Sequence, residues 1–116
     1  MGYYLFHAYR VETPIFTRRA DALLSEDDRA TLIATLAANP KAGAVMPGSG
    51  GLRKMRFAPE GQGKSGAFRV IYFLLNDEIP ILALLLYGKN EQANPTPDQK
   101  KAMRSLVDTL KAVARE

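Results

Sequence analysis

Residues 67–87 read AFRVIYFLLNDEIPILALLLY, and this stretch decides the fold. Its first part, 67–75, is β-branched, aromatic and apolar, which is typical of a strongly buried strand. The polar residues 76–78 mark a turn, and 79–87 form a second apolar strand. Two neighbouring strands with so few polar positions indicate a central place in a sheet that is covered on much of both faces.

A third strand precedes this pair. In LRKMRFA, residues 52–58, side chains alternate so that Lys54 and Arg56 share one face while Arg53 points to the other. A Gly-rich loop at 59–66 leads into the first apolar strand. Because short loops join three consecutive strands, the sequence predicts an antiparallel meander.

Upstream of the meander, the pattern changes from strand to helix. A first strand is predicted over 5–12, followed by a helical hairpin over 14–38. Thr13 and Ser25 stand where the two helices need side-chain caps. Residues 40–51 are rich in Gly and Pro and form a loop rather than a domain linker, because the strands after them cannot fold alone.

The chain ends in one more helix. Thr96 caps it, Pro97 is its first residue, and Gln99 completes a capping-box pattern. An apolar stripe at helical spacing is interpreted as core or partner-facing, and it contains Met103, Leu106, Val107, Leu110 and Val113. The predicted class is therefore α+β: a small antiparallel sheet with an N-terminal helical hairpin and a C-terminal helix.

Composition excludes several kinds of protein. Of the 116 residues, 47% are hydrophobic and 24% charged, values that predict one globular domain over 1–116. There is no cysteine and one histidine, His7, so we expect no disulfide, metal site or cofactor. The longest apolar run, Ile79–Tyr87, is too short to cross a bilayer, and the start is not interpreted as a signal peptide. We therefore expect a cytoplasmic protein with no membrane partner.

The string APEGQGKS, residues 58–65, fits a relaxed phosphate-loop template that ends in Gly63, Lys64 and Ser65. A phosphate loop needs a helix directly after it, because the helix N-terminus holds the phosphates. Here the next residues have the composition of a strand. We therefore interpret the string as a hairpin loop that carries a cation and not as a nucleotide-binding loop.

Positive charge is concentrated around this loop. Over 52–69 there are five basic residues and one acid, Glu60, although the net charge of the whole chain is only +4. In a meander, Arg56 comes near Arg69 across the first hairpin, and Lys89 comes near Arg69 from the end of the last strand. The sequence therefore predicts a convergence of cations at one end of the sheet, which suggests an anionic partner.

Such a cluster binds phosphates and can also cleave RNA without a metal. The ribose 2′-hydroxyl is then the nucleophile, cations stabilise the charged phosphate oxygens, and a lysine among other cations accepts the proton. The alternative is that Arg56 and Arg69 neutralise acids at the strand ends, namely Glu60, Asp77 or Glu78.

These motifs resemble a known family. GSGGLRKMRFAPEGQGKSGAFRVIYFLL, followed by LLLYGKNE and a short terminal helix, is similar to the RelE/HigB toxins of bacterial type II toxin–antitoxin systems, and most similar to the HigB-like branch. The likeness covers residues 39 to about 110. It implies a microbial-ribonuclease-like fold and a bacterial cytoplasmic endoribonuclease that cuts mRNA in the decoding site of the ribosome. It also implies a partner, a small helix-turn-helix antitoxin of the HigA type.

The resemblance also implies roles for individual residues. It assigns charge stabilisation and proton transfer to Lys54, Arg56, Arg69 and Lys89, and RNA binding is expected of Arg53, Lys64, Tyr87 and Asn90. Several family members have an arginine where this chain has Asn90, and some have a tyrosine or histidine near the C-terminus that is absent here. The general base therefore stays open between Lys54 and Lys89. Two other functions also stay open: a ParE-like inhibitor of DNA gyrase, and a protein that binds RNA or ribosomes without cutting.

Overall fold

The structure is a computed structural model that describes residues 5–7, 10–59, 67–74, 81–88 and 90–114. In chain order the elements are β1 (Leu5–His7), β2 (Arg10–Glu12), α1 (Pro14–Leu23), α2 (Glu26–Ala38), β3 (Ala44–Val45), β4 (Arg53–Phe57), β5 (Phe68–Phe73), β6 (Ile81–Gly88) and α3 (Pro97–Ala114). The α+β class is confirmed, and so is the predicted order of the helices and the three main strands.

All six strands form one sheet in the order β1-β2-β6-β5-β4-β3. The antiparallel meander of β4, β5 and β6 is confirmed, and β3 adds a short antiparallel edge beside β4. At the other side of the meander, β2 pairs in parallel with β6. The element after residues 60–66 is the strand β5, as predicted, and not the helix that a phosphate loop requires.

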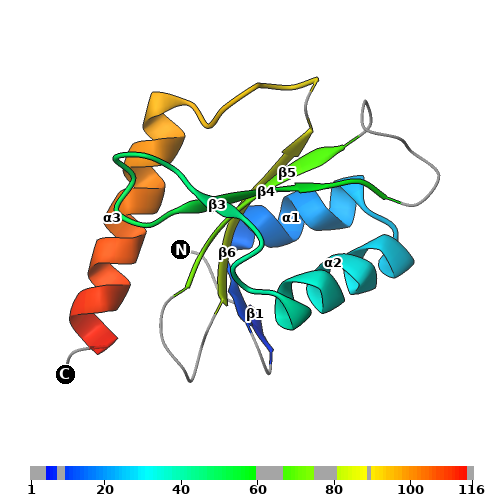
Figure 1. Cartoon of the computed structure of the whole chain (residues 1–116), viewed down its shortest axis with the longest axis horizontal. Coiled ribbons are helices and arrows are strands. Elements are labelled where there is room, and N and C mark those ends of the chain that lie inside the picture. Colours follow the sequence, from blue (N-terminus) through cyan, green and yellow to red (C-terminus); the bar gives the residue numbers. More distant parts are fainter. Residues whose placement is uncertain (1–4, 8–9, 60–66, 75–80, 89, 115–116) are drawn as a thin grey trace.

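The sheet lies between two helical layers. Figure 1 shows α1 and α2 together on one face and α3 on the other. The hairpin core lies under α1 and α2 and includes Phe16, Leu32, Leu36, Met55, Phe57, Val70, Tyr72 and Leu86. The α3 core lies on the opposite face and includes Leu52, Ile71, Phe73, Leu82, Leu84, Leu85, Tyr87, Met103 and Val107. Cover on both faces explains why β5 and β6 are almost continuously apolar.

A β-bulge interrupts the pairing of β5 with β6. Ile71 pairs with Leu85, but the next residue, Tyr72, pairs with Ala83, so Leu84 is an extra residue in β6. As a result Leu84 and Leu85 both pack in the α3 core, although neighbouring residues of a regular strand point to opposite faces.

Three features of the sheet differ from the prediction. The pairing of β2 with β6 is parallel, so the sheet is mixed and not antiparallel throughout. The single strand predicted over 5–12 is two short strands, with His7 paired antiparallel to Arg10. Polar and apolar residues alternate only in the second half of that segment, and only this half, β2, pairs with the buried strand β6. In addition, the loop predicted over 40–51 contains β3, because Ala44 and Val45 complete the ladder beside β4.

The predicted caps are confirmed. The side chain of Thr13 accepts the backbone N–H three residues further on at 3.1 Å, and that of Ser25 does the same at 3.1 Å. Thr96 and Gln99 form a reciprocal capping box: the Thr96 N–H donates to Gln99 Oε1 at 2.9 Å, and the Gln99 N–H donates to Thr96 Oγ1 at 3.1 Å. These local signals fix the start of all three helices.

The loop between α2 and β4 is tied to the sheet through Tyr72. The Tyr72 hydroxyl donates to Pro40 O at 2.8 Å and accepts from Gly43 N–H at 2.7 Å. A Cβ on Gly43 would lie 2.8 Å from the Tyr72 ring, so only glycine permits this approach. The loop is therefore part of the fold and not a linker, as predicted.

A buried carboxylate joins the sheet to both helices of the hairpin. Glu12, at the end of β2, is 0% exposed. It accepts a hydrogen bond from Thr17 Oγ1 on α1 at 2.8 Å and forms an ion pair with Arg29 on α2 at 2.7 Å. Arg29 also forms an ion pair with Asp21 of α1. Three elements therefore meet at one charged group.

The longest helix is α3. Its predicted apolar stripe is confirmed at four positions, since Met103 and Val107 are buried and Leu106 and Leu110 are partly buried against the sheet. The fifth predicted member, Val113, has a side chain outside the described part of the structure. Lysines, arginines and acids occupy much of the remaining surface of α3. Among the described residues, no helix combines the length and the apolar character needed to cross a membrane.

Candidate functional site

Three residues of the predicted site form a row across the sheet. Arg56 of β4 pairs directly with Arg69 of β5, and Arg69 pairs with Tyr87 of β6. Paired residues share a face, and Tyr87 belongs to the α3 core, so the whole row lies on the α3 side of the sheet. The predicted approach of Arg56 to Arg69 is therefore confirmed.

The environment of Arg69 is unusual for an arginine. Its side chain is half-buried, and its Nη1 atom is fully buried with no hydrogen-bond acceptor among the described residues. Such a donor costs about 1–3 kcal/mol. A second guanidinium, that of Arg56, belongs to the residue directly opposite, and like charges in that position destabilise a sheet further. The pair therefore has a local charge excess that a bound anion would relieve.

Tyr87 is the third member of the row. It is 1% exposed, and its hydroxyl donates a long hydrogen bond of 3.4 Å to Ala93 O. Burial raises the pKa of the Tyr87 phenol above its ordinary value of 10.0, and the nearby Arg69 charge acts in the opposite direction. The phenol therefore stays protonated at neutral pH and can donate a proton but not accept one.

Lys54 lies on the same face as this row. It is two residues before Arg56 on β4, and the ordinary rise of a strand separates the two Cα atoms by about 7 Å. The Lys54 Nζ donates to Asn94 Oδ1 at 3.1 Å. Asn94 belongs to the segment between β6 and α3, so this hydrogen bond joins that segment to β4.

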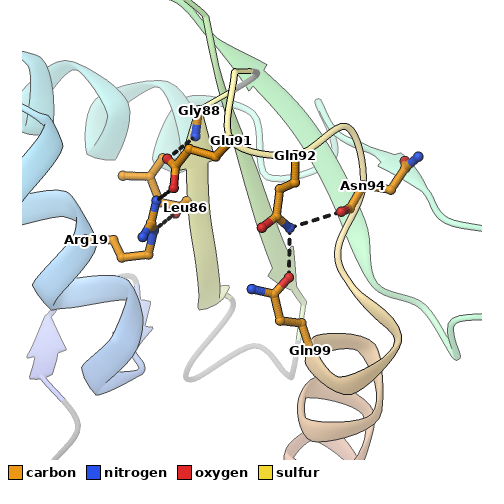
Figure 2. A network of polar contacts seen from close by, with 7 residues as sticks. All are labelled: Arg19, Leu86, Gly88, Glu91, Gln92, Asn94 and Gln99. Carbon is orange, nitrogen blue, oxygen red and sulfur yellow. Dashed lines mark hydrogen bonds and ion pairs between the residues drawn. The ribbon is translucent and has the colours of Figure 1, made fainter.

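The same segment is anchored at its start. Figure 2 shows the Glu91 carboxylate between Arg19 of α1 and the backbone N–H of Gly88. The Gly88 hydrogen bond has a length of 2.8 Å. Arg19 also donates to Leu86 O, so one α1 side chain holds both β6 and the residues after it.

The end of the segment is anchored to α3. Gln92 Nε2 donates to Asn94 O at 3.0 Å and to Gln99 Oε1 at 2.7 Å (Figure 2). The Asn94 side chain points away from Gln92, which leaves its amide oxygen for Lys54. The position of Lys54 is therefore linked through two amides to the capping box of α3.

A basic groove opens beside Lys54, between the segment 44–49 and the first two turns of α3. It consists of two adjoining hollows of about 410 Å³ and about 310 Å³, which share Met46, Pro47 and Lys100. Lys54 and Asn94 line the first hollow, and Lys101 and Arg104 line the second. The described residues that line the two hollows include four cations and no acid.

The structure separates the predicted site residues into three groups. Lys54, Arg56, Arg69 and Tyr87 share one face of the sheet. Arg53 lies on the other face, where its guanidinium donates to Gly43 O at 2.7 Å, and Asn90 is exposed in the turn after β6. The third group lies outside the described residues and comprises Lys64 and Lys89, together with Glu60, Asp77 and Glu78.

Sequence reasoning missed the cations of α3 and Asn94. Lys100, Lys101 and Arg104 stand in the run QKKAMR just after the capping box, and Lys100 and Arg104 are one helical turn apart. That spacing was a usable signal. What the sequence could not give was the position of α3 against residues 44–49, which depends on tertiary packing.

A search for a metal site and a comparison with known protein families complete the description of the site. Within the described part of the chain, no three histidine, aspartate or glutamate residues come together as a metal-ion site would need. No protein family model matches the chain.

Proposed function

We propose that this protein is an endoribonuclease that cuts mRNA on the ribosome and thereby stops translation. The observation that carries the proposal is the Arg56–Arg69 pair, which has two guanidinium groups on paired residues and a buried Nη1 without an acceptor among the described residues. Phosphodiesters supply the acceptor oxygens and the negative charge that this pair lacks.

The chemistry uses the groups on this face. The ribose 2′-hydroxyl attacks the adjacent phosphorus, and the bond to the 5′-oxygen breaks. The leaving 5′-oxygen takes a proton from water, so a 2′,3′-cyclic phosphate and a free 5′-hydroxyl result. Arg56 and Arg69 stabilise the charge on the phosphate oxygens in the transition state. Lys54 is our first choice for the group that accepts the 2′-hydroxyl proton. Lys89 is the second choice and lies outside the described residues.

The resemblance to RelE/HigB toxins supports the ribosomal part of the proposal. The segments GLRKMRF, GKSGAFRVIY and YGKNE, in an α+β fold of this order, are the basis of that likeness. We accordingly propose a RelE-like fold, a bacterial cytoplasmic location and neutralisation by a HigA-like helix-turn-helix antitoxin.

Induced expression in bacteria without the antitoxin tests the proposal. We expect rapid arrest of protein synthesis and new mRNA 5′ ends within translated regions. Arg69→Ala should lower the cleavage rate by about 100-fold, the usual cost of removing one group that stabilises transition-state charge. Arg18→Ala, which removes an exposed arginine of α1, is the matched control and should leave cleavage unchanged.

The same experiment identifies the other functions. DNA damage together with intact mRNA would indicate a gyrase inhibitor and would overturn the proposal. Arrest without cleavage that persists in a Lys54→Ala/Arg69→Ala double variant would indicate a protein that binds RNA or ribosomes without cutting.

A further inference from the structure

We propose that the basic groove beside α3 is a second phosphate-binding region that holds the backbone of a single-stranded RNA outside the cleaved bond. The inference rests on the proposed function, because it extends the same RNA strand away from Arg56 and Arg69. It assigns a binding role to Lys100, Lys101 and Arg104, which lie outside the motifs of the sheet.

The groove has the size and the charge of a binding site. Each of its two hollows falls in the volume range of small-ligand pockets, at about 310 Å³ and about 410 Å³. Among the described residues, Lys54, Lys100 and Lys101 take part in no ion pair. Of the four cations, Arg104 alone forms an ion pair among the described residues, with Asp108 at 3.4 Å, and both of these side chains are more than half exposed. Lys54 has a neutral partner, Asn94. Most of the positive charge is therefore available to a ligand.

The far end of the groove is held in place by close packing. A Cβ on Gly50 would lie 2.8 Å from the Arg104 guanidinium carbon, so this side chain lies directly against the glycine backbone. Gly50 has φ +79°, a conformation that favours glycine. The loop 46–51 and the first turns of α3 therefore form one surface and not two independent ones.

Lys54 connects the groove to the arginine pair. It lines the larger hollow and shares a face of β4 with Arg56. A strand with its reacting phosphate at Arg56 and Arg69 would therefore pass Lys54 before it reaches Lys100. Positive charge continues along this whole path, as single-stranded nucleic acids require.

The composition of the groove favours phosphates over bases and over an acidic peptide. No aromatic side chain is among the described lining residues, so the groove offers no platform for base stacking. Its continuity with the arginine pair favours one strand that spans both regions. An acidic protein segment would need no such continuity.

Binding of uncleavable oligonucleotides tests the inference separately from catalysis. A 2′-O-methyl RNA has no free nucleophile, so its affinity for the full chain can be measured without cleavage. We compare a dinucleotide with an octanucleotide over a range of salt concentrations. For Lys100→Ala/Arg104→Ala we expect the octanucleotide to bind about tenfold more weakly, with a salt slope smaller by about 1.4, while the dinucleotide binds as before.

Two further variants make the result specific. Arg18→Ala removes an equivalent charge from the other side of the sheet and should leave octanucleotide affinity unchanged. Lys101→Glu reverses one charge in the groove and should weaken the octanucleotide more than Lys101→Ala does. Near-UV circular dichroism verifies that each variant is folded.

The possible results distinguish an RNA-binding groove from a protein-docking site, and the groove from the proposed catalytic function. Unchanged octanucleotide affinity and salt slope in the double variant would overturn the inference. It would also be overturned if a poly-glutamate peptide bound in a Lys100-dependent way while the octanucleotide did not, because the groove would then be a protein-docking site. Octanucleotide binding as predicted, in a protein that cuts no mRNA in cells, would support the groove and contradict the proposed catalytic function.

Discussion

At the scale of single residues, two arginines on adjacent strands have opposite surroundings. Arg53 of β4 lies on the hairpin side of the sheet and donates to the carbonyl oxygen of Gly43 at 2.7 Å. Arg69 of β5 lies on the α3 side with Nη1 buried and no acceptor among the described residues. The first arginine should stabilise the fold, whereas the second should reduce its stability.

This contrast gives the first prediction. Arg69→Met keeps the apolar stem but removes the charge, so we expect the free energy of unfolding to rise by about 1 kcal/mol. Arg53→Met removes a satisfied donor and should lower it by about 1 kcal/mol. Urea unfolding of both variants measures the two changes. If Arg69→Met is as destabilising as Arg53→Met, Arg69 has a structural partner and our assignment of a ligand role is wrong.

The residue scale is also where sequence reasoning reached its limit. Strand alternation correctly separated Arg53 from Lys54 and Arg56, because the period of two depends only on the backbone. The meander correctly brought Arg56 beside Arg69. The buried Nη1 atom was not predictable, since it depends on how the α3 core closes around the sheet. Asn94 was missed because a single amide in a loop carries no sequence pattern.

At the scale of elements, the segment between β6 and α3 is shaped by its anchors. Glu91 is the first of them, and the backbone N–H of Gly88 holds the pKa of its carboxyl below the ordinary value of 4.5. Partial burial opposes this effect, and the hydrogen bond and charge of Arg19 add to it. The ionised form of Glu91 is therefore favoured in the folded protein.

The pH dependence of this anchor is the second prediction. Because the folded pKa is depressed, the stabilisation is complete above pH 4.5 and is lost as the pH falls through the lower, folded value. Glu91→Gln should cost less than about 1 kcal/mol at neutral pH, since the side chain is 41% exposed. The stability of the variant and that of the wild type should converge once the pH falls below the folded pKa of Glu91. In an Arg19→Met background the cost at neutral pH should shrink, and a constant difference at all pH values would contradict the assignment.

Element boundaries were predictable where a local signal exists. Each helix start is marked in the sequence by side chains that cap the backbone of the helix, namely Thr13, Ser25 and the Thr96–Gln99 box. The bulge at Leu84 has no such signal, because within an all-apolar strand one extra leucine leaves the pattern unchanged. The edge strand β3 was missed because it is only two residues long. It is recognised as a strand by its pairing with β4, which the sequence does not show.

At the scale of the whole molecule, the α3 face combines core and site. Toward one end of this face α3 covers the sheet with Met103 and Val107, and the row from Arg56 to Tyr87 continues the same face. The basic groove lies where α3 begins, next to the segment 44–49. A sequence can show that Lys100 and Arg104 share a helix side, but only the docking of that helix places them beside Lys54.

The third prediction concerns the buried carboxylate that joins the sheet to the layer formed by α1 and α2. Glu12 is fully buried and links β2 to α1 and α2 through Thr17 and Arg29. Removing one partner of a buried ion pair leaves a poorly compensated charge, so Arg29→Met should lower the free energy of unfolding by about 3 kcal/mol. Arg18→Met, on the exposed side of α1, is the control and should change it by less than about 0.5 kcal/mol.

Two spectroscopic probes test whether the hairpin and the sheet unfold together in this variant. Because Glu12 belongs to β2 and is bonded to α1 and α2, the loss of Arg29 should destabilise the hairpin and the sheet together. Far-UV circular dichroism, which reports on the helices, and near-UV signals of buried Tyr72 and Tyr87 should therefore shift to the same lower midpoint. If the far-UV transition of Arg29→Met shifted while the tyrosine signals kept the wild-type midpoint, the hairpin would unfold independently of the sheet. Glu12 would then be a local contact and not the joint between the layers.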